Sequence, residues 1–240
     1  MVNLSSIYAQ VLIEFGLDEF SSKEFKKSTC ISNPNLILHR LCEKGYVTRL
    51  SRGLYKATHP LILALEQGGW KWREKISQKE YLSIIEFVIV RLIEVFWKKL
   101  VSLVIFGSIV CGKAKKESDI DLLVVAESLP ERYSERLKLV RKALIGVEDV
   151  RIKIWREKKK YPLLDIIILN PQEALTNHPF YLDMVKESII VFDRKNFMKN
   201  KLESLKRKLS ELGAKRIALP DGKWYWDLKT EIGKGEVIQL

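Results

Sequence analysis

One stretch of the sequence, residues 104–125, restricts the fold of this chain more than any other. Two continuous apolar runs flank a loop that opens with Gly107 and Ser108. Apolar runs of this length are typical of buried strands. Asp119 and Asp121 stand two residues apart at the start of the second run, so both carboxylates should project from one face of that strand. The sequence therefore predicts a buried sheet with two acids at the start of one strand.

The loop between the two predicted strands has the features of an anion site. We expect a helix to begin at Gly107-Ser108, which would leave free backbone N–H groups and the Ser108 hydroxyl facing an anion. Glycine at position 107 would let a phosphate approach the main chain. Two carboxylates as close as Asp119 and Asp121 repel each other, but they are reasonable ligands around divalent cations. The pattern favours phosphate and metal chemistry.

A third acid, Asp165, lies in the apolar run Leu163–Leu169. An ionised carboxylate among such residues is costly unless it faces a metal, a partner charge or solvent. Asp149, just before another predicted strand, is an alternative to Asp165. Three carboxylates of this kind suit phosphoryl transfer with two metal ions.

The order Gly-Ser, ten residues, Asp-x-Asp and a later strand Asp resembles the polymerase-β-like nucleotidyltransferase superfamily, in its small prokaryotic and archaeal type. The resemblance implies Mg²⁺-dependent transfer of a nucleoside monophosphate from an NTP, with ATP expected, to an acceptor hydroxyl. Pyrophosphate is released. By resemblance, the catalytic residues and ligands of two Mg²⁺ ions are Asp119, Asp121 and Asp165. The expected nucleotide-binding residues are Gly107, Ser108, Lys113 and Ser118.

The chain departs from this family pattern at two positions. Many small members carry basic residues two and four positions after the glycine, where this chain has Ile109 and Cys111. Neutralisation of the phosphates would then fall to lysines of the same loop or to another segment. The loop lysines are Lys113, Lys115 and Lys116.

The first sixty residues predict three helices and a hairpin. Asn33, Pro34 and Gly45 are typical of the cap, first residue and terminating residue of the third helix. This order resembles a winged helix-turn-helix, which implies DNA or RNA contact. The third helix would enter the major groove and the wing would meet phosphates. The residues expected to bind nucleic acid are Asn35, His39, Arg40, Arg49 and Arg52. Small winged domains also serve in dimerisation or protein docking, and that alternative stays open.

Elsewhere the pattern predicts a connector, an amphipathic helix over 81–99, a helix over 131–144 and an alternating strand, Val150–Trp155. Further along we expect a helix near 178–187, a strand over 188–192, a helix over 195–212 and a hairpin that turns at Pro220-Asp221-Gly222. Residues 151–160 contain six basic residues and one acid, which indicates either a hairpin that grips the acceptor or a solvated connection. Trp224-Tyr225-Trp226 should cover an edge of the core, with base stacking as the alternative.

Composition limits the kinds of partner and the cellular location that we expect for this chain. Lys and Arg number 42 against 30 Asp and Glu, a net charge of +12 that favours anionic partners. Three cysteines without a CxxC pattern exclude a disulfide scaffold. The longest apolar stretch, 81–100, carries five charges and predicts no membrane span. No signal peptide is visible, and we expect a cytoplasmic protein.

Together these features predict an α+β protein with a winged helix-turn-helix and a nucleotidyltransferase-type mixed sheet flanked by helices. The expected domains are 1–62 (winged helix-turn-helix), 63–80 (connector), 81–195 (nucleotidyltransferase) and 196–240 (C-terminal helix and hairpin). The last segment would finish the second domain or form a homodimer contact. The expected activity is nucleotidyl transfer to a nucleic acid or a protein. The alternative is a DNA-binding regulator or antitoxin-like protein whose nucleotidyltransferase fold is not catalytic.

Overall fold

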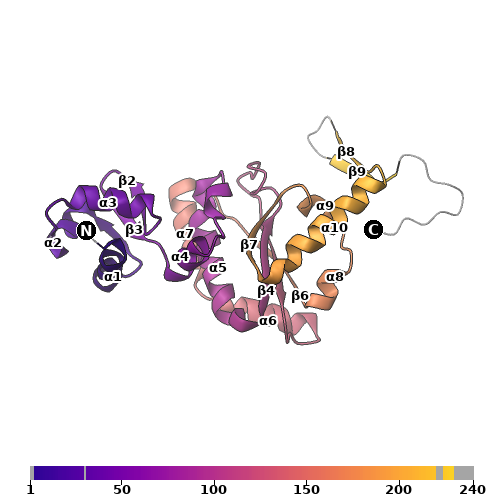
Figure 1. Cartoon of the computed structure of the whole chain (residues 1–240), viewed down its shortest axis with the longest axis horizontal. Coiled ribbons are helices and arrows are strands. Elements are labelled where there is room, and N and C mark those ends of the chain that lie inside the picture. The colour runs from indigo at the N-terminus through magenta and orange to yellow at the C-terminus, as the bar shows by residue number, and fades with distance from the viewer. Residues whose placement is uncertain (1–2, 30, 220–223, 230–240) are drawn as a thin grey trace, which may run out of the picture. The chain divides into compact units, whose positions relative to one another are not determined.

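A computed structural model describes residues 3–29, 31–219 and 224–229 of the 240-residue chain. The chain divides into two compact units, residues 1–69 and 70–240. Figure 1 labels most of the helices and strands of both. The predicted turn at Pro220-Asp221-Gly222 lies outside the described residues.

The first unit contains four helices and three strands among its described residues. They are α1 (Leu4–Phe15), β1 (Glu19–Ser21), α2 (Ser22–Ser28), α3 (Pro34–Glu43), β2 (Val47–Ser51), β3 (Leu54–Ala57) and α4 (Pro60–Gln67). The caps follow the sequence. Ser21 and Glu24 form a reciprocal capping box on α2, and the Asn33 side chain accepts a hydrogen bond from the Leu36 N–H of α3.

Two features of this unit differ from the sequence-based expectation. The hairpin β2–β3 gains a third strand, β1, because β3 pairs with both neighbours in the order β1-β3-β2. A helix, α4, starts at Pro60 and crosses the predicted boundary between the first domain and the connector. The core beneath the sheet joins all three early helices, through residues such as Val11, Phe25 and Leu38.

The second unit is built on a four-stranded mixed sheet in the order β6-β5-β4-β7 (Figure 1). Its strands are β4 (Leu100–Phe106), β5 (Ile120–Ala126), β6 (Leu164–Leu169) and β7 (Ser188–Asp193). β4 runs antiparallel to β5 and β7, whereas β5 and β6 are parallel. All seven residues of β4 are buried, as its apolar run predicts.

The predicted strand Val150–Trp155 is wrong, because these residues belong to helix α7 (Val147–Lys158). β5 and β6 are parallel neighbours, so the chain between them must cross over the sheet, and α6 (Tyr133–Ala143) and α7 supply that crossover. Acids in the first turn of α7 and bases in its last turn also suit a helix. The alternation of Val150, Ile152 and Ile154 with polar residues misled the prediction.

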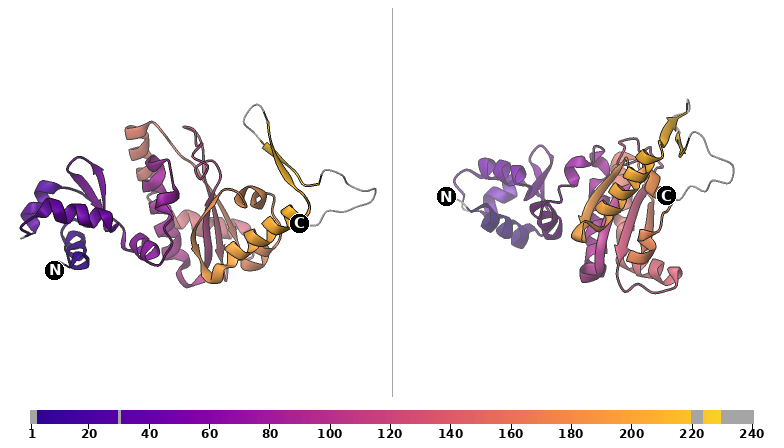
Figure 2. Two further views of the ribbon diagram at one scale, coloured as in Figure 1. Left: turned by 45° about the horizontal axis from the view of Figure 1, so that its top comes forward. Right: turned by 45° about the vertical axis from the view of Figure 1, so that its right-hand side comes forward.

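Helices cover both faces of this sheet. α5 (Leu82–Phe96), with α6 and α7 beside it, lies on one face, and α10 (Phe197–Glu211) crosses the other (Figures 1 and 2). The α10 face packs Leu202, Leu205 and Leu209 against alternate residues of β4 and β5. The remaining elements are η1 (Arg73–Lys75), η2 (Lys79–Tyr81), η3 (Trp97–Lys99), α8 (Pro171–Leu175), α9 (Phe180–Met184), η4 (Arg194–Asn196), β8 (Lys215–Ala218) and β9 (Trp224–Asp227).

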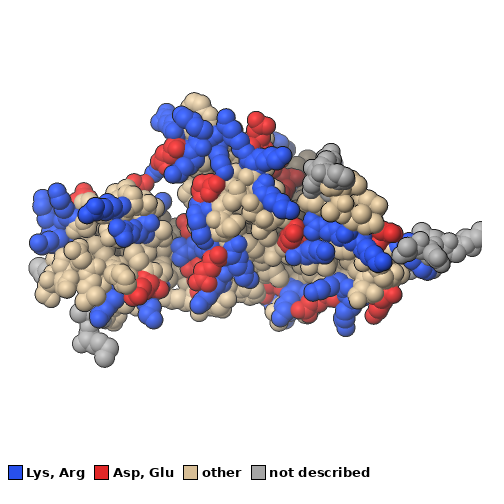
Figure 3. Space-filling model, turned by 90° about the horizontal axis from the view of Figure 1, so that it is seen from above, with Lys and Arg blue, Asp and Glu red and all other residues tan. Residues whose placement is uncertain are grey.

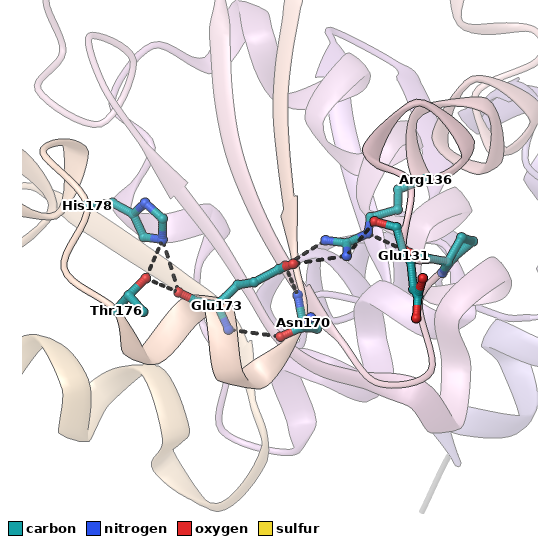
Figure 4. Close-up of polar contacts among 7 residues, drawn as sticks. Glu131, Arg136, Asn170, Glu173, Thr176 and His178 are labelled. Carbon is teal, nitrogen blue, oxygen red and sulfur yellow. Dashed lines mark hydrogen bonds and ion pairs between the residues drawn. The ribbon is translucent and has the colours of Figure 1, made fainter.

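An ion pair between the buried Arg136 and the partly exposed Glu173 joins the helices that follow β5 and β6 (Figure 4). Arg136 of α6 donates to both oxygens of Glu173 on α8, at 2.6 and 2.9 Å, and its Nε donates to the Pro130 carbonyl at 2.6 Å. Asn170 and Glu173 form a capping box on α8. The Arg136 guanidinium, through its hydrogen bonds, lowers the pKa of Glu173. This end of the sheet is a paired, structural network.

Charge on the surface is dispersed. Figure 3 shows Lys and Arg side chains over much of one face, with Asp and Glu side chains between them. No helix among the described residues has the length and apolar character needed to span a bilayer.

Candidate functional site

The register of the sheet brings the predicted site residues to one edge. Asp165 of β6 pairs with Asp121 of β5, Asp121 pairs with Phe106 of β4, and Phe106 pairs with Ser188 of β7. Asp121 and Asp165 stand one residue after the starts of parallel strands, and the antiparallel β4 ends beside them. Two acids and the Gly107 turn therefore lie in one row. Asp149 is not part of this row, since it lies in the first turn of α7.

Gly107 is in direct contact with Asp121. Its φ is +77°, and a Cβ at this position would lie 1.9 Å from Asp121 Oδ2. A side chain at position 107 would therefore overlap the carboxylate and also strain the backbone. Only glycine allows the turn and the carboxylate to approach this closely.

The loop after Gly107 is a series of turns, so the expected helix at Gly107-Ser108 is wrong. The Ser108 carbonyl accepts a hydrogen bond from the Lys113 N–H at 3.0 Å, and Gly112 has a φ of +67°. Two left-handed residues within six positions leave no room for a helix. The backbone N–H groups of the turn nevertheless follow the end of β4, as the sequence predicts.

Residues 77–81 hold this loop in place. The Gln78 side-chain amide makes two hydrogen bonds with the Ala114 backbone, both 2.9 Å, and the Tyr81 hydroxyl donates to the Lys115 carbonyl at 3.0 Å. Sequence reasoning missed both residues, since nothing in the pattern around position 78 indicates a partner thirty-six residues away. The hydroxyl of Ser118, which is predicted to bind nucleotide, accepts a hydrogen bond from the Lys115 N–H at 2.8 Å and so closes the loop.

The carboxylates at this edge are electrostatically unfavourable as they stand. The pKa of Asp121 is raised from 3.8 to about 6, first by burial and then by the charges of Asp165 and Asp119. Asp119 and Asp165 are exposed, whereas Asp121 is half-buried. A partly buried carboxylate facing two others, with its ionisation disfavoured, is the arrangement that a bound cation relieves.

The donor set fits Mg²⁺ in chemistry, although it is not a complete cage. Within the described ranges no group of three or more His, Cys, Asp and Glu side chains is disposed to hold a metal ion. Mg²⁺ prefers oxygen ligands and usually keeps several waters, being held by one or two carboxylates together with substrate phosphates. The neighbours Asp121 and Asp165, with Asp119, meet that requirement.

The structure explains the two positions, 109 and 111, at which the chain differs from the family pattern. Ile109 is fully buried and belongs to the core. The Cys111 thiol contacts the Gly107 carbonyl at 3.3 Å and donates to Glu187 Oε2 at 2.7 Å. Burial, followed by the Glu187 carboxylate, raises the pKa of Cys111 to about 11, so this thiol stays protonated. Lys113, Lys115 and Lys116 are exposed in the same loop.

The residues predicted to bind nucleic acid lie on two elements of the first unit. Asn35, His39 and Arg40 are exposed on α3, where His39 lies 3.5 Å from Glu43. Arg49, on β2, and Arg52, in the turn to β3, are exposed as well.

At one edge of the mixed sheet the turn after β4 lies beside the paired acids Asp121 and Asp165, and comparison with known proteins shows what this domain is similar to. Residues 89–203, just under half of the chain, match the family model described as "Nucleotidyltransferase domain". A protein of Methanocaldococcus jannaschii named "Putative protein adenylyltransferase MJ1305" is 29% identical over 134 residues, which is 55% of this chain and 84% of that protein. These findings support the nucleotidyltransferase superfamily for this domain.

Two solved structures are also similar. One is described as a toxin–antitoxin with AMP-PNP and the other as a mutant of the toxin–antitoxin MntA-HpeT. They are 16% and 15% identical, and each match covers 52% of this chain and 90% of the other, with a TM-score of 0.35. At that level of similarity nothing further follows about this chain.

Proposed function

We propose that this chain transfers the AMP moiety of ATP to an acceptor hydroxyl and releases pyrophosphate. The observation that carries the proposal is the row formed by Asp165, Asp121 and the Gly107 turn at one sheet edge. Carboxylates for metal ions and backbone N–H groups for phosphates are the parts that such a transfer needs, because catalysis of phosphoryl transfer is mainly positioning and charge stabilisation.

The acids and the Gly107 turn have separate tasks. Asp119, Asp121 and Asp165 would hold two Mg²⁺ ions, which supply charge stabilisation for the triphosphate when bound. The N–H groups of Gly107 and Ser108 would orient the β- and γ-phosphates, so that the α-phosphorus lies near the carboxylates. The acceptor oxygen attacks the α-phosphorus, the bond to the bridging oxygen breaks, and pyrophosphate leaves with the electron pair. Asp165, exposed beside Asp121, is placed to accept the hydroxyl proton.

The acceptor we propose is a protein hydroxyl. This choice rests on the relative that is named a protein adenylyltransferase and that aligns over most of its own length. A nucleic-acid acceptor is the competing outcome, which the +12 net charge would suit.

The test is transfer of label from α-labelled ATP, with Mg²⁺, to total protein and RNA, followed by protease and nuclease digestion. Asp119→Ala with Asp121→Ala should reduce labelling below detection, and Asp165→Ala should reduce it strongly. Asp149→Ala is the matched control, because this acid lies in α7 outside the row. Activity that survives the double change would overturn the mechanism. Label removed by nuclease but not by protease would replace the protein acceptor with RNA.

We also propose that the first unit is a winged helix-turn-helix that binds nucleic acid. Supporting it are the exposed polar and basic residues on α3 and on the β2–β3 hairpin. In this proposal Arg40 contacts bases or phosphates from α3, and Arg49 and Arg52 contact phosphates from the wing. Replacement of Arg52 by Ala should reduce the slope of log K against log salt by about 1. An unchanged slope for all three arginines would favour a docking role instead.

The rival function is a DNA-binding regulator or antitoxin-like protein without turnover. Calorimetric binding of ATP with and without Mg²⁺ separates the two. An active site should bind ATP more tightly with Mg²⁺, whereas a non-catalytic domain should bind little.

A further inference from the structure

The C-terminal hairpin, β8 and β9, lies outside residues 89–203, yet its side chains contact Lys113 of the loop after Gly107 and Glu187 beside β7. The guanidinium carbon of Arg216, on β8, lies 3.9 Å from the ring centroid of Trp224, on β9. The Lys113 ammonium, from the loop after Gly107, lies 6.0 Å from the same centroid. Two cations from distant parts of the chain therefore meet at one indole ring.

The Glu187 carboxylate connects this cluster to the Gly107 turn. Glu187 Oε2 accepts from the Cys111 thiol at 2.7 Å and from Arg216 Nη2 at 3.4 Å. The same thiol contacts the Gly107 carbonyl at 3.3 Å. Glu187 also directly precedes Ser188, which pairs with Phe106 at the sheet edge. Arg216 is therefore connected to the turn through only two side chains.

Glu187 engages only one of the N–H donors of Arg216. The hydrogen bonds from Cys111 and Arg216, together with the charge of Lys113, lower the pKa of Glu187, so one carboxylate is shared between two cations. Asp183 is also present and accepts from the Trp224 indole N–H at 2.9 Å. Guanidinium carries five N–H donors in all. The Arg216 side chain is only 11% exposed, so its position is set by the ring and the carboxylate.

The position of the cluster along the sheet edge indicates which ligand group it would bind. Along the sheet edge the order is the carboxylates on β6 and β5, the Gly107 turn after β4, and then Glu187 with Arg216 beside β7. A triphosphate with its α-phosphate at the carboxylates and its β- and γ-phosphates along the turn points the terminal γ-phosphate toward β7. We propose that Arg216 and Lys113 bind this terminal phosphate of the nucleoside triphosphate. The inference rests on the proposed function.

This assignment supplies positive charge that the family pattern places at positions 109 and 111, where this chain has Ile109 and Cys111. Ile109 is committed to the core and Cys111 stays a neutral thiol, so neither can neutralise phosphate. The hairpin supplies the missing charge from another part of the chain. When the bond to the α-phosphorus breaks, negative charge grows on the departing pyrophosphate, and Arg216 and Lys113 would stabilise it there.

The test is calorimetric binding of Mg·ATP, AMP and inorganic tripolyphosphate to the full-length chain, which needs no turnover. Arg216→Gln and, separately, Lys113→Ala should each weaken Mg·ATP and tripolyphosphate about tenfold and leave AMP unchanged. Arg207→Gln, at an exposed position of α10, is the matched control and should change none of the three. Melting temperatures show which variants are folded.

The outcomes are distinguishable. Unchanged tripolyphosphate binding by a folded Arg216→Gln variant overturns the inference. If that variant does not fold, Lys113→Ala, at an exposed loop position, decides in the same way. A wild-type chain that binds tripolyphosphate through Arg216 but labels no acceptor would overturn the proposed function and leave the inference standing. If the wild type labels an acceptor but all variants bind tripolyphosphate with the wild-type affinity, the inference is overturned and the proposed function stands.

Discussion

The two edges of the four-stranded sheet carry charged side chains in opposite arrangements. At the carboxyl ends of β5 and β6, Arg136 and Glu173 neutralise each other and satisfy nearby backbone groups. At the other ends of the same strands, Asp121 and Asp165 face each other beside Asp119, and the pKa of Asp121 rises to about 6. Paired charges stabilise one edge, whereas like charges at the other edge cost stability. The difference indicates that the second edge is arranged for a ligand.

The largest effect should come from Gly107→Ala. We expect the free energy of unfolding to fall by about 3 kcal/mol, because the new methyl group meets Asp121 and the backbone is left-handed. Gly213→Ala is the control, with a φ of +69° but nothing within 4 Å of the added Cβ. It should cost only about 1 kcal/mol. Urea unfolding measures both, and equal losses would show that the contact with Asp121 has no effect.

Glu173→Gln should weaken the opposite edge by about 2 kcal/mol, because it leaves the buried Arg136 without a charged partner. Since the folded-state pKa of Glu173 is lowered, its contribution is present at neutral pH and is lost as the pH falls through that value. The difference in melting temperature between wild type and variant should therefore shrink in acid. Nucleotide binding should not change, and a loss of binding would contradict the separation of the two edges.

Asp121→Asn should have the opposite sign at pH 7 and stabilise the chain by about 1 kcal/mol. A folded-state pKa raised from 3.8 to about 6 means that the folded chain holds the proton more tightly, so wild-type stability falls as pH rises through this window. The variant has no such group. The two unfolding curves should converge below pH 4, and a constant difference across pH would refute the assignment.

The smallest effect is that of Mg²⁺ on wild-type stability. At a concentration equal to its dissociation constant, a ligand stabilises the folded state by only about 0.4 kcal/mol. We expect Mg²⁺ to raise the melting temperature of wild type, and Ca²⁺ or Na⁺ at equal ionic strength to serve as controls. The variant carrying Asp119→Ala and Asp121→Ala should show no Mg²⁺-specific rise, and an equal rise in both chains would exclude these carboxylates as ligands.

Most elements of the second unit could be predicted, because continuous apolar runs in the sequence indicate buried strands. β4 and β5 contain the two apolar runs of residues 104–125, and β6 begins one residue after the start of the run Leu163–Leu169. The exception, α7, shows the limit of periodicity. Its residues alternate as a strand would, but the parallel pairing of β5 and β6 requires a crossover in this segment. Local pattern cannot reveal which strands will be parallel neighbours.

The acids were predicted more completely than their surroundings. Asp119, Asp121 and Asp165 are visible in the sequence because carboxylates stand out beside apolar runs. Gln78 and Arg216 carry no such signal, since a glutamine or an arginine near the surface is ordinary in a chain of this composition. Their contacts join segments separated by 36 residues or more, and only folding brings these together.

By itself, the sequence determined the apolar strands, the helix caps of the first unit, and the residue types of the Gly107 turn and its acids. These depend on local propensity and on burial, which are encoded position by position. The tertiary structure decided that Asp165, rather than Asp149, stands beside Asp121, and that Arg216 contacts Glu187, which in turn contacts the loop after Gly107 through Cys111. Register and crossover set those distances, because a one-residue slip of β6 would turn the carboxylate of Asp165 to the other face of the sheet.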